Sequence, residues 1–314
     1  MTSDTYIYIG WVKDIINRLI PGKDIFDYPS VLNPISGREG NLKLRHLLEE
    51  TAPFLAGRIG STELRNLLHF NGIIFAAKAP YYLEKESGIF PRNYSTAKRF
   101  IKETEESLSS IDILISFGWE YEGYLKQFLN HDAIITKPRA LEPYLIPDEG
   151  WWHALGGKKL LIVNCFASLI KQRFTYEILE KLWPNEKQYL DKIIPKHITA
   201  IDTPLNWETS TKQRFKSYSD VTCDLKKKID SADFDIALVA CGGIGLPLAA
   251  WIKNQGKQAI HTGGVIQVFT GINGKRFSTQ MPWKEIDKTH WVNAPQLMRT
   301  EPAFGDAASY WYHD

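Results

Sequence analysis

Glycines follow an apolar stretch in the second half of the sequence, in a pattern that can bind phosphate. Residues 235–240 are apolar apart from the first, and Cys241-Gly-Gly-Ile-Gly245 and Pro247 follow them. Proline suits the first turn of a helix, so the pattern predicts a buried strand, a glycine turn and a helix. Backbone N–H groups at such a turn attract phosphate, although the same glycines also let a helix pack closely on its sheet. The glycines that would admit a diphosphate are Gly242, Gly243 and Gly245.

Polar groups close the next predicted strand, 258–261, and continue beyond it. His261 is suited to bind a sugar or phosphate group or to carry a proton. Lys275 and Arg276 are suited to neutralise a diphosphate, arginine through its bidentate fork. A structural histidine and a solvated basic loop are the alternatives, and the sequence leaves them open. Further candidates for substrate binding in this stretch are Gly263, Gly264 and Gln267.

A third stretch, Gly57-Arg-Ile-Gly-Ser-Thr-Glu63, joins the apolar run 53–59 to a helical pattern at 64–70. Glu63 falls in the first turn of that predicted helix, where the helix dipole stabilises a carboxylate and the side chain can act as a cap. Alternatively, Glu63 faces the crevice at the strand end and binds a metal–diphosphate or the donor sugar. The neighbouring candidates for substrate binding are Arg58, Gly60 and Ser61.

Weaker candidates follow other predicted strands. Asn164, Ser168 and Lys171 come after the run 158–163 and would line the same crevice if their side chains face it. Glu142, in Leu-Glu-Pro-Tyr, is suited to act as a base or to bind sugar, although the proline after it favours a structural turn. The groups that qualify as the base for an acceptor hydroxyl are His261, Glu142 and Glu122.

Short apolar runs alternate with helical patterns along most of the chain. This alternation predicts an α/β fold, with a Rossmann-like, mostly parallel sheet and helices on both faces. Ligands of such sheets bind at the carboxyl ends of the strands, where the three glycine-containing stretches would meet. The predicted strands are 53–59, 111–117, 133–136, 158–163, 197–203, 235–240 and 258–261.

Two regions of different character are expected along the chain. Residues 1–50 are predicted to form an N-terminal helical extension, and residues 51–314 one α/β domain. In the extension, 8–20 has the spacing of an amphipathic helix, and packing on the domain's own core is favoured over a membrane surface because few basic residues accompany it. The aromatic-rich segment 283–314 either forms a lid near the site or covers core residues.

The composition excludes several classes of protein. Of 314 residues, 44% are hydrophobic and 24% are charged, with a net charge of +2, which excludes a disordered chain and gives no reason to expect nucleic acid as a partner. Three separated cysteines form neither a disulfide framework nor a zinc-binding pattern, so a reduced cytoplasmic setting is expected. Glycines and a proline interrupt the uncharged run 236–252, which is not expected to span a membrane. Residues 1–10 lack the features of a signal peptide, and peripheral attachment to the inner face of the membrane stays open.

Three blocks of the sequence occur in an order that resembles one family. They are Gly57–Glu63, Ala140-Leu-Glu-Pro-Tyr144 and Ala259-Ile-His-Thr-Gly-Gly-Val-Ile-Gln-Val-Phe-Thr-Gly-Ile-Asn-Gly-Lys-Arg276. Over about residues 54–311 the chain resembles the bacterial GT-D-type glycosyltransferase-like domains of capsule and cell-surface polysaccharide loci, most specifically in the last block. The resemblance implies a Rossmann-like fold, a nucleotide-sugar donor and an Asp-x-Glu motif that binds a divalent metal.

The match to that motif is incomplete. Glu63 takes the place of the glutamate and would be a metal ligand, whereas Ser61 stands where the aspartate should be. Mn²⁺ and Mg²⁺ prefer carboxylate oxygens, so the loss of one weakens the expected cofactor site. Lys275 and Arg276 are suited to supply part of the missing positive charge.

The leading hypothesis is a glycosyltransferase of the hexosyl type. It would transfer a sugar from a nucleotide-diphosphate sugar, UDP-linked or similar, to a surface glycan or a lipid-linked acceptor. The alternative is a non-catalytic partner in a glycan-synthesis complex that binds a nucleotide sugar or polysaccharide, which Ser61 favours. An enzyme that uses NAD or S-adenosylmethionine fits less well, because His261 stands where an acidic ribose ligand is expected. Whether the chain forms a homo-oligomer stays open.

Overall fold

The computed structural model describes residues 32–295 and 305–311 of the chain. The predicted helix at 8–20, much of the expected extension and part of the segment 283–314 lie outside these residues. The described part of residues 1–50 contains helix α2 (Gly37–Glu49), which begins where the Ser36 hydroxyl accepts a hydrogen bond from the Glu39 N–H. Its side chains Leu44 and Leu48 are buried in one cluster with residues of the sheet.

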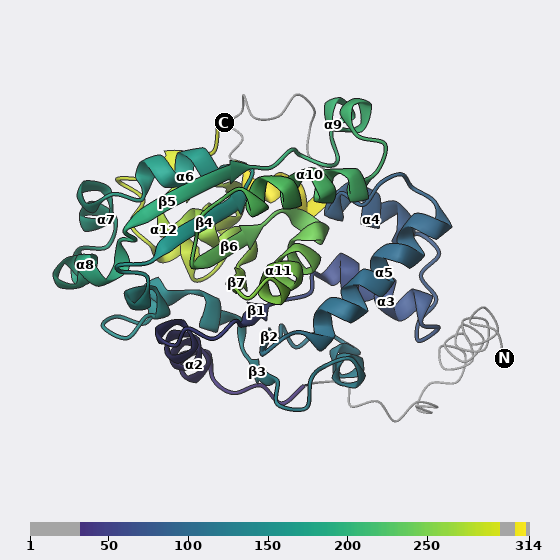
Figure 1. Ribbon diagram of the computed structural model, residues 1–314, viewed down its shortest axis with the longest axis horizontal. Coiled ribbons are helices and arrows are strands. Elements are labelled where there is room, and N and C mark those ends of the chain that lie inside the picture. The colour runs from purple at the N-terminus through teal and green to yellow at the C-terminus, as the bar shows by residue number, and fades with distance from the viewer. Residues whose placement is uncertain (1–31, 296–304, 312–314) are drawn as a thin grey trace.

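Within the described chain, seven parallel strands form one sheet in the order β3-β2-β1-β7-β6-β4-β5. In Figure 1 the strands follow one another from β5 at the upper left to β3 near the bottom. Each strand lies in a segment that the sequence predicts, so the mostly parallel α/β sheet is confirmed. The strands are β1 (Leu55–Gly57), β2 (Ile113–Ile115), β3 (Ile134–Thr136), β4 (Lys159–Asn164), β5 (His197–Asp202), β6 (Ile236–Ala240) and β7 (Gln258–His261), and a separate parallel pair is formed by β8 (Ile272–Asn273) and β9 (Val292–Asn293).

Helices cover both faces of the sheet. The helices whose apolar residues share the first buried cluster are α3 (Ser61–Phe70), α4 (Ala79–Ser87), α5 (Tyr94–Ser109), α10 (Tyr218–Asp230) and α11 (Gly245–Asn254). Those of the second cluster are α2, α6 (Ala167–Arg173), α7 (Tyr176–Leu182), α8 (Leu190–Ile193), α12 (Ile266–Phe269) and α13 (Lys275–Thr279). Helix α9 (Thr209–Arg214) follows β5. Short 3-10 helices span Glu122–Gln127, Pro138–Leu141, Pro143–Leu145, Trp151–Ala154, Pro184–Tyr189, Gly242–Ile244, Gly263–Val265, Trp283–Glu285 and Gly305–Tyr310.

The alternation of side chains along each strand explains why these segments are apolar throughout. In β6, Ala237 and Val239 belong to the first cluster, whereas Ile236, Leu238 and Ala240 belong to the second. Successive side chains of a strand point to opposite faces, and both faces of this sheet are covered. An unbroken apolar run is therefore the pattern that this architecture needs.

The apolar run 236–252 forms β6, a glycine turn and α11 rather than one continuous helix. Pro247 lies in the first turn of α11, where its missing N–H costs no hydrogen bond. In the parts of the chain that the structure describes, no helix combines the length and the apolar character needed to cross a membrane.

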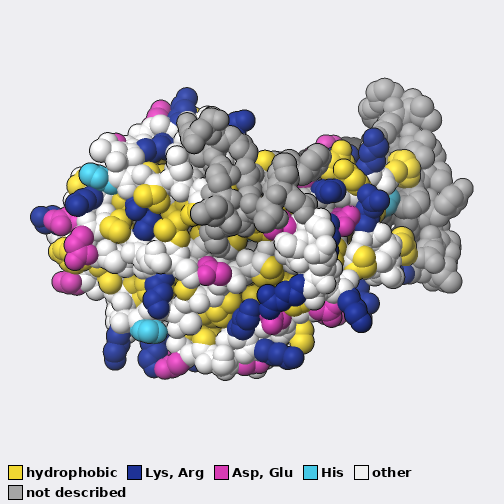
Figure 2. All heavy atoms as spheres, turned by 90° about the horizontal axis from the view of Figure 1, so that it is seen from above, with side chains coloured by type: hydrophobic (Ala, Val, Ile, Leu, Met, Phe, Trp, Pro, Cys, Tyr) yellow, Lys and Arg dark blue, Asp and Glu magenta, His cyan; other side chains and the backbone are white. Residues whose placement is uncertain are grey.

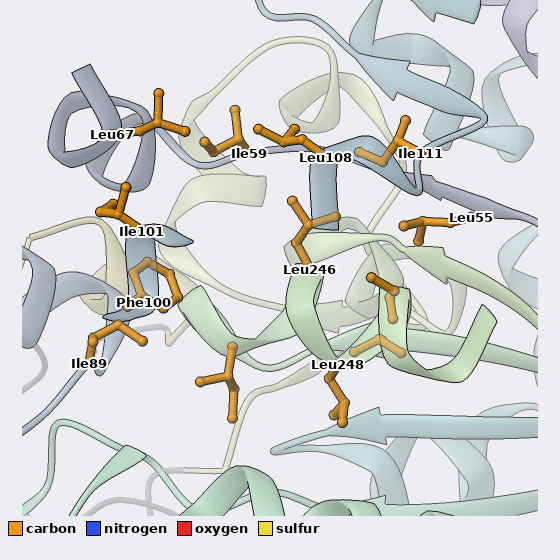
Figure 3. Packing of buried hydrophobic residues seen from close by; sticks show 14 of the residues in the cluster. Leu55, Ile59, Leu67, Ile89, Phe100, Ile101, Leu108, Ile111, Leu246 and Leu248 are labelled. Atoms are coloured by element: carbon orange, nitrogen blue, oxygen red, sulfur yellow. The ribbon is translucent and has the colours of Figure 1, made fainter. Parts of the chain in front are cut away.

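Helix α11 lies at the centre of the first cluster. In Figure 3, Leu246 of α11 lies among side chains that include Leu67 of α3 and Phe100 of α5. The contacts link the helix after β6 to the helices after β1, and they fix how the loops between these elements meet at the strand ends.

We expect Leu248→Ala to lower the free energy of unfolding by about 2–5 kcal/mol, because Leu248 is fully buried on α11 and its truncation leaves a cavity. Leu42→Ala is the matched control, since Leu42 is 38% exposed on α2, and should cost less than about 1 kcal/mol. Urea denaturation followed by circular dichroism measures both. Equal losses of unfolding free energy in the two variants would contradict the packing of α11 at the centre of the first cluster.

Candidate functional site

A cavity of about 540 Å³ lies at the carboxyl ends of the strands. Residues that follow β1, β2, β4, β5, β6 and β7 line it. Four consecutive strands send the chain alternately to the two faces of the sheet: β1 leads to α3, β7 to α12, β6 to α11 and β4 to α6. Such a divergence leaves a crevice between the outgoing loops, which is where parallel sheets bind ligands.

The carboxylate of Glu63 lies beside the glycine turn after β6. Glu63 occupies the first turn of α3 and lines the cavity. It approaches Gly243 so closely that a Cβ atom on that glycine would be 3.2 Å from Glu63 Oε1. The sequence left two roles open for Glu63, a helix cap and a contact with a ligand in the crevice. The position beside Gly243 is compatible with the ligand contact. Gly60, Ser61 and Gly242 also line the cavity.

His261 lies in the cavity wall as a neutral imidazole. Its Nδ1 lies 3.0 Å from the carbonyl oxygen of Arg58, which can only accept, so Nδ1 carries the proton and Nε2 is the acceptor. Burial, and then the charge of Arg58, lower the pKa of His261 to about 3. Nε2 also adjoins Gly245, where an added Cβ would lie 2.6 Å away. A base of such low pKa is a poor proton acceptor near neutral pH, so the site favours a hydrogen-bonding role for His261.

The guanidinium of Arg58 provides positive charge at the cavity. It lies 5.3 Å from the centroid of the Phe117 ring, and Phe117 stacks on Trp119 at 4.7 Å. On its other side is Gly263, whose φ of +58° suits glycine and whose missing Cβ would otherwise lie 2.7 Å from Arg58 Nε. No carboxylate among the described residues pairs with Arg58, so its charge is available to an anionic ligand.

The segment 305–311 forms part of the cavity wall. Arg276 lies in the first turn of α13 and not in a loop, and its Nη1 donates to the Tyr310 hydroxyl at 2.8 Å. Gln267 Nε2 donates to the Tyr310 carbonyl oxygen at 3.3 Å, and Gly264 adjoins the Tyr310 ring. Gly263, Gly264, Gln267 and Arg276 all line the cavity. Both the lid and the core-covering roles expected for 283–314 are compatible with this position.

Several predicted site residues lie away from the cavity lining. The Ser168 hydroxyl donates a hydrogen bond to the Asp202 carboxylate, and Ser168 does not line the cavity. Lys171 and Lys275 are exposed. Glu142 is buried against Arg139, and burial raises the pKa of its carboxyl. The residues among the predicted set that do not line the cavity are Glu122, Glu142, Ser168, Lys171, Gly245 and Lys275.

Two other candidates have structural partners that use their polar atoms. Asn164 lines the cavity, but its Nδ2 donates to the Ala240 carbonyl at 2.8 Å and its Oδ1 accepts from the Phe166 N–H at 2.7 Å, so it ties β4 to β6. Glu122 accepts from the Ser116 hydroxyl and from the N–H groups of Phe117 and Gly118. It therefore anchors the loop after β2 instead of facing a ligand.

Sequence reasoning missed part of the cavity lining. Glu86 and Asn206 both line it, as do Thr203 and Trp207. The segment 203–207 follows directly after a predicted strand, so the rule that ligands bind at strand ends could have identified it. Glu86, in contrast, lies near the end of α4, and its position in the wall follows from how that helix packs.

The cavity does not hold a complete set of metal ligands. Among the described residues no group of three His, Cys, Asp or Glu side chains is placed to bind a metal ion. Glu63 and Glu86 are its acidic lining residues, and Glu86 accepts a hydrogen bond from the Thr62 hydroxyl. These oxygens fit a divalent cation only where phosphate oxygens of a ligand complete its coordination.

Charged side chains of both signs are mixed on one face of the molecule. On the face shown in Figure 2, basic side chains are interspersed with acidic and apolar ones over the described residues. A mixed surface of this kind does not produce the one-signed field that attracts nucleic acid.

Comparisons with known proteins give little further information. No protein-family model matches the chain, and no curated protein matches it. A solved structure described as "Selenomethionine substituted structure of domain of unknown function 1792 (DUF1792)" is similar at 15% identity, over 76% of this chain and 80% of that chain, with a TM-score of 0.43. At this degree of similarity we draw no functional conclusion from the likeness, and the fold rests on the sheet topology itself.

We expect the imidazole of His261 to stay neutral from pH 8 to about pH 4, because its pKa in the folded protein is about 3. The unfolded chain binds this proton below its ordinary pKa of about 6.5, so unfolding takes up a proton between these two values. The free energy of unfolding should therefore decrease as the pH falls from about 6.5 towards 3, and decrease less in His261→Gln. Imidazole NMR signals and urea denaturation across this range measure the two effects. A His261 signal that titrates near pH 6.5 would contradict the arrangement.

Proposed function

We propose that the chain binds a nucleotide-diphosphate sugar in this cavity and transfers the sugar to a glycan or lipid-linked acceptor. The observation that carries the proposal is the convergence of a carboxylate, an available guanidinium and two glycine turns on one cavity at the strand ends. Pockets of 300–1,000 Å³ accommodate ligands of this size, as a rough range. The resemblance noted in the sequence agrees with this reading.

The diphosphate has a suitable environment between the turns after β6 and β7. The first N–H groups of such helical turns have no partner within the turn and can donate to anions. Arg58 adds a positive charge that can bind two phosphate oxygens at once. During transfer the bond between the anomeric carbon and the diphosphate oxygen breaks, and these groups would stabilise the negative charge on the leaving diphosphate.

Glu63 and Glu86 are the carboxylates of the lining that remain available for the other steps. Glu63 adjoins the glycine turn and would contact the donor sugar, or a Mn²⁺ or Mg²⁺ ion held jointly with the diphosphate. Such an ion would supply further positive charge at the leaving group. The acceptor oxygen would form the new bond to the anomeric carbon, and its proton would pass to one of these two carboxylates, which are the acidic groups of the lining.

The second candidate function is binding without catalysis, within a glycan-synthesis complex. Two observations favour it. The described residues contain no three-ligand metal cluster, and Ser61 stands where the motif of the family that the sequence resembles has an aspartate. Both candidates use the same cavity and the same diphosphate contacts. They differ in whether bound nucleotide sugar is consumed.

We expect Arg58→Ala to weaken the binding of UDP or GDP by about 10- to 100-fold, because the variant loses charge-assisted hydrogen bonds to the diphosphate. Arg65→Ala is the matched control: Arg65 lies exposed on the neighbouring helix α3, outside the cavity lining, and carries the same charge. Isothermal titration calorimetry with UDP, GDP and their hexose conjugates measures the affinities. Equal affinities of the two variants and the wild type would refute the diphosphate site.

We expect Glu63→Gln to slow the transfer or hydrolysis of the nucleotide sugar by about 100-fold or more, since the variant keeps the size of the side chain and loses its charge. Glu39→Gln is the control, because Glu39 occupies the same first-turn position of helix α2 and is exposed. The loss of the favourable interaction with a helix dipole is then similar in both variants. Nucleotide release measured by chromatography reports the rate. Wild-type protein that binds nucleotide sugar but releases none would favour the non-catalytic function.

A further inference from the structure

The amide of Asn206 is a feature of the cavity that no hydrogen bond among the described residues explains. Asn206 is only 7% exposed and lines the cavity. Neither Nδ2 nor Oδ1 has a hydrogen-bond partner among the residues that the structure describes. Buried polar groups are nearly always paired, and leaving one unpaired destabilises the folded protein. An amide retained in this state at a cavity wall indicates a group that pairs with a ligand.

The backbone around Asn206 is held in place although its amide is not. The Glu208 N–H donates to the Leu205 carbonyl oxygen at 3.0 Å, which closes a turn between β5 and α9. Gly88, at the end of α4, packs against this turn, and a Cβ atom added to Gly88 would lie 2.5 Å from Asn206 Cβ. The position of the side chain is thus set by packing at its base, which leaves the amide free to pair with something else.

The surroundings of Asn206 combine polar groups with aromatic rings. Thr203 and Glu86 line the same cavity, and they add a hydroxyl and a carboxylate to the amide. Trp207 lies 6.0 Å from Trp311, ring centroid to centroid, and Trp311 in turn packs on Phe166. Amide, hydroxyl and carboxylate groups pair with adjacent hydroxyls, while a ring accepts the apolar face of a sugar.

The lining after β2 has a different character from the lining after β5, and four strands of the sheet lie between these two strands. There Arg58 lies over Phe117, which stacks on Trp119, so this part offers a flat aromatic surface beside a positive charge. A planar base next to a phosphate suits this surface, since bases stack on aromatic rings. The two parts of the cavity therefore match the two unlike ends of a nucleotide sugar.

We infer that Asn206 binds the hydroxyl groups of the sugar moiety and determines which sugar the protein accepts. This assignment rests on the proposed function. It adds to that function which part of the cavity lining contacts which part of the ligand. The sugar lies against Asn206, Thr203 and Trp207, the diphosphate against the glycine turns and Arg58, and the base against Phe117 and Trp119.

The test compares nucleotides with and without their sugar. Calorimetry with UDP, UDP-glucose, GDP and GDP-mannose is carried out on the wild type and on Asn206→Ala, which keeps the Cβ atom that packs on Gly88. We expect affinity for the sugar conjugate to fall by about 10- to 100-fold, because two or more hydrogen bonds are lost. Affinity for the bare diphosphate should change by less than about twofold, since its contacts lie elsewhere.

Two further variants separate ligand recognition from a structural effect. Thr270→Val is the control: the Thr270 hydroxyl is buried and has no partner among the described residues, but it lies outside the cavity lining. It should leave every affinity unchanged. Asn206→Leu has nearly the same size as the native side chain but no polar atom, and should show the same selective loss if Asn206→Ala fails to fold.

The outcomes distinguish this inference from the proposed function. Equal losses for the diphosphate and its sugar conjugate would place the base or phosphate at Asn206, which overturns the inference and leaves the proposed function standing. Unchanged affinities in both Asn206 variants would overturn it as well. A wild-type protein that binds none of the four nucleotides would overturn the inference and the proposed function together.

Discussion

The parallel register of the strands is the constraint on which the site depends. Parallel strands all end at the same edge of the sheet, so loops that are far apart in the sequence meet there. β1 and β7 are neighbours, and so are β6 and β4, while each pair sends its following helices to opposite faces. The hollow between the diverging loops is therefore a consequence of the order of strands. The apolar residues that hold the sheet between two layers of helices also maintain this hollow.

Arg58 connects the ends of several strands through unlike interactions. Its carbonyl oxygen accepts a hydrogen bond from His261 Nδ1 at the end of β7, and its guanidinium lies over the Phe117 ring after β2. Its positive charge also helps to keep His261 neutral. Arg58 thus lies beside an uncharged imidazole rather than beside a second positive group, and the carboxylate of Glu63 lies at the glycine turn after β6. This separation of charges suits a ligand with an anionic centre and neutral ends.

The sequence predicted the fold more completely than the site. Apolar runs identified the seven strands, since a strand that is covered on both faces needs an apolar residue at every position. The sequence also predicted that the glycine turn at 242–245 and Glu63 lie at one crevice, because the apolar pattern shows where each strand ends. The pattern does not show in which direction a side chain points. Lys275 and Arg276 are adjacent in α13, where successive side chains point in different directions, and only Arg276 reaches the cavity. Asn206 was missed because an unpaired amide is a property of the folded protein and leaves no mark in the sequence.

The segment 305–311 has a consequence for how the cavity is used. It contacts the rest of the protein through hydrogen bonds, such as the one from Arg276 to the Tyr310 hydroxyl, and through the ring of Trp311, which is buried against Phe166 and Trp207. None of these contacts belongs to the seven-stranded sheet. Substitutions at Tyr310 or Trp311 would therefore reshape the cavity while the strands keep their order and register.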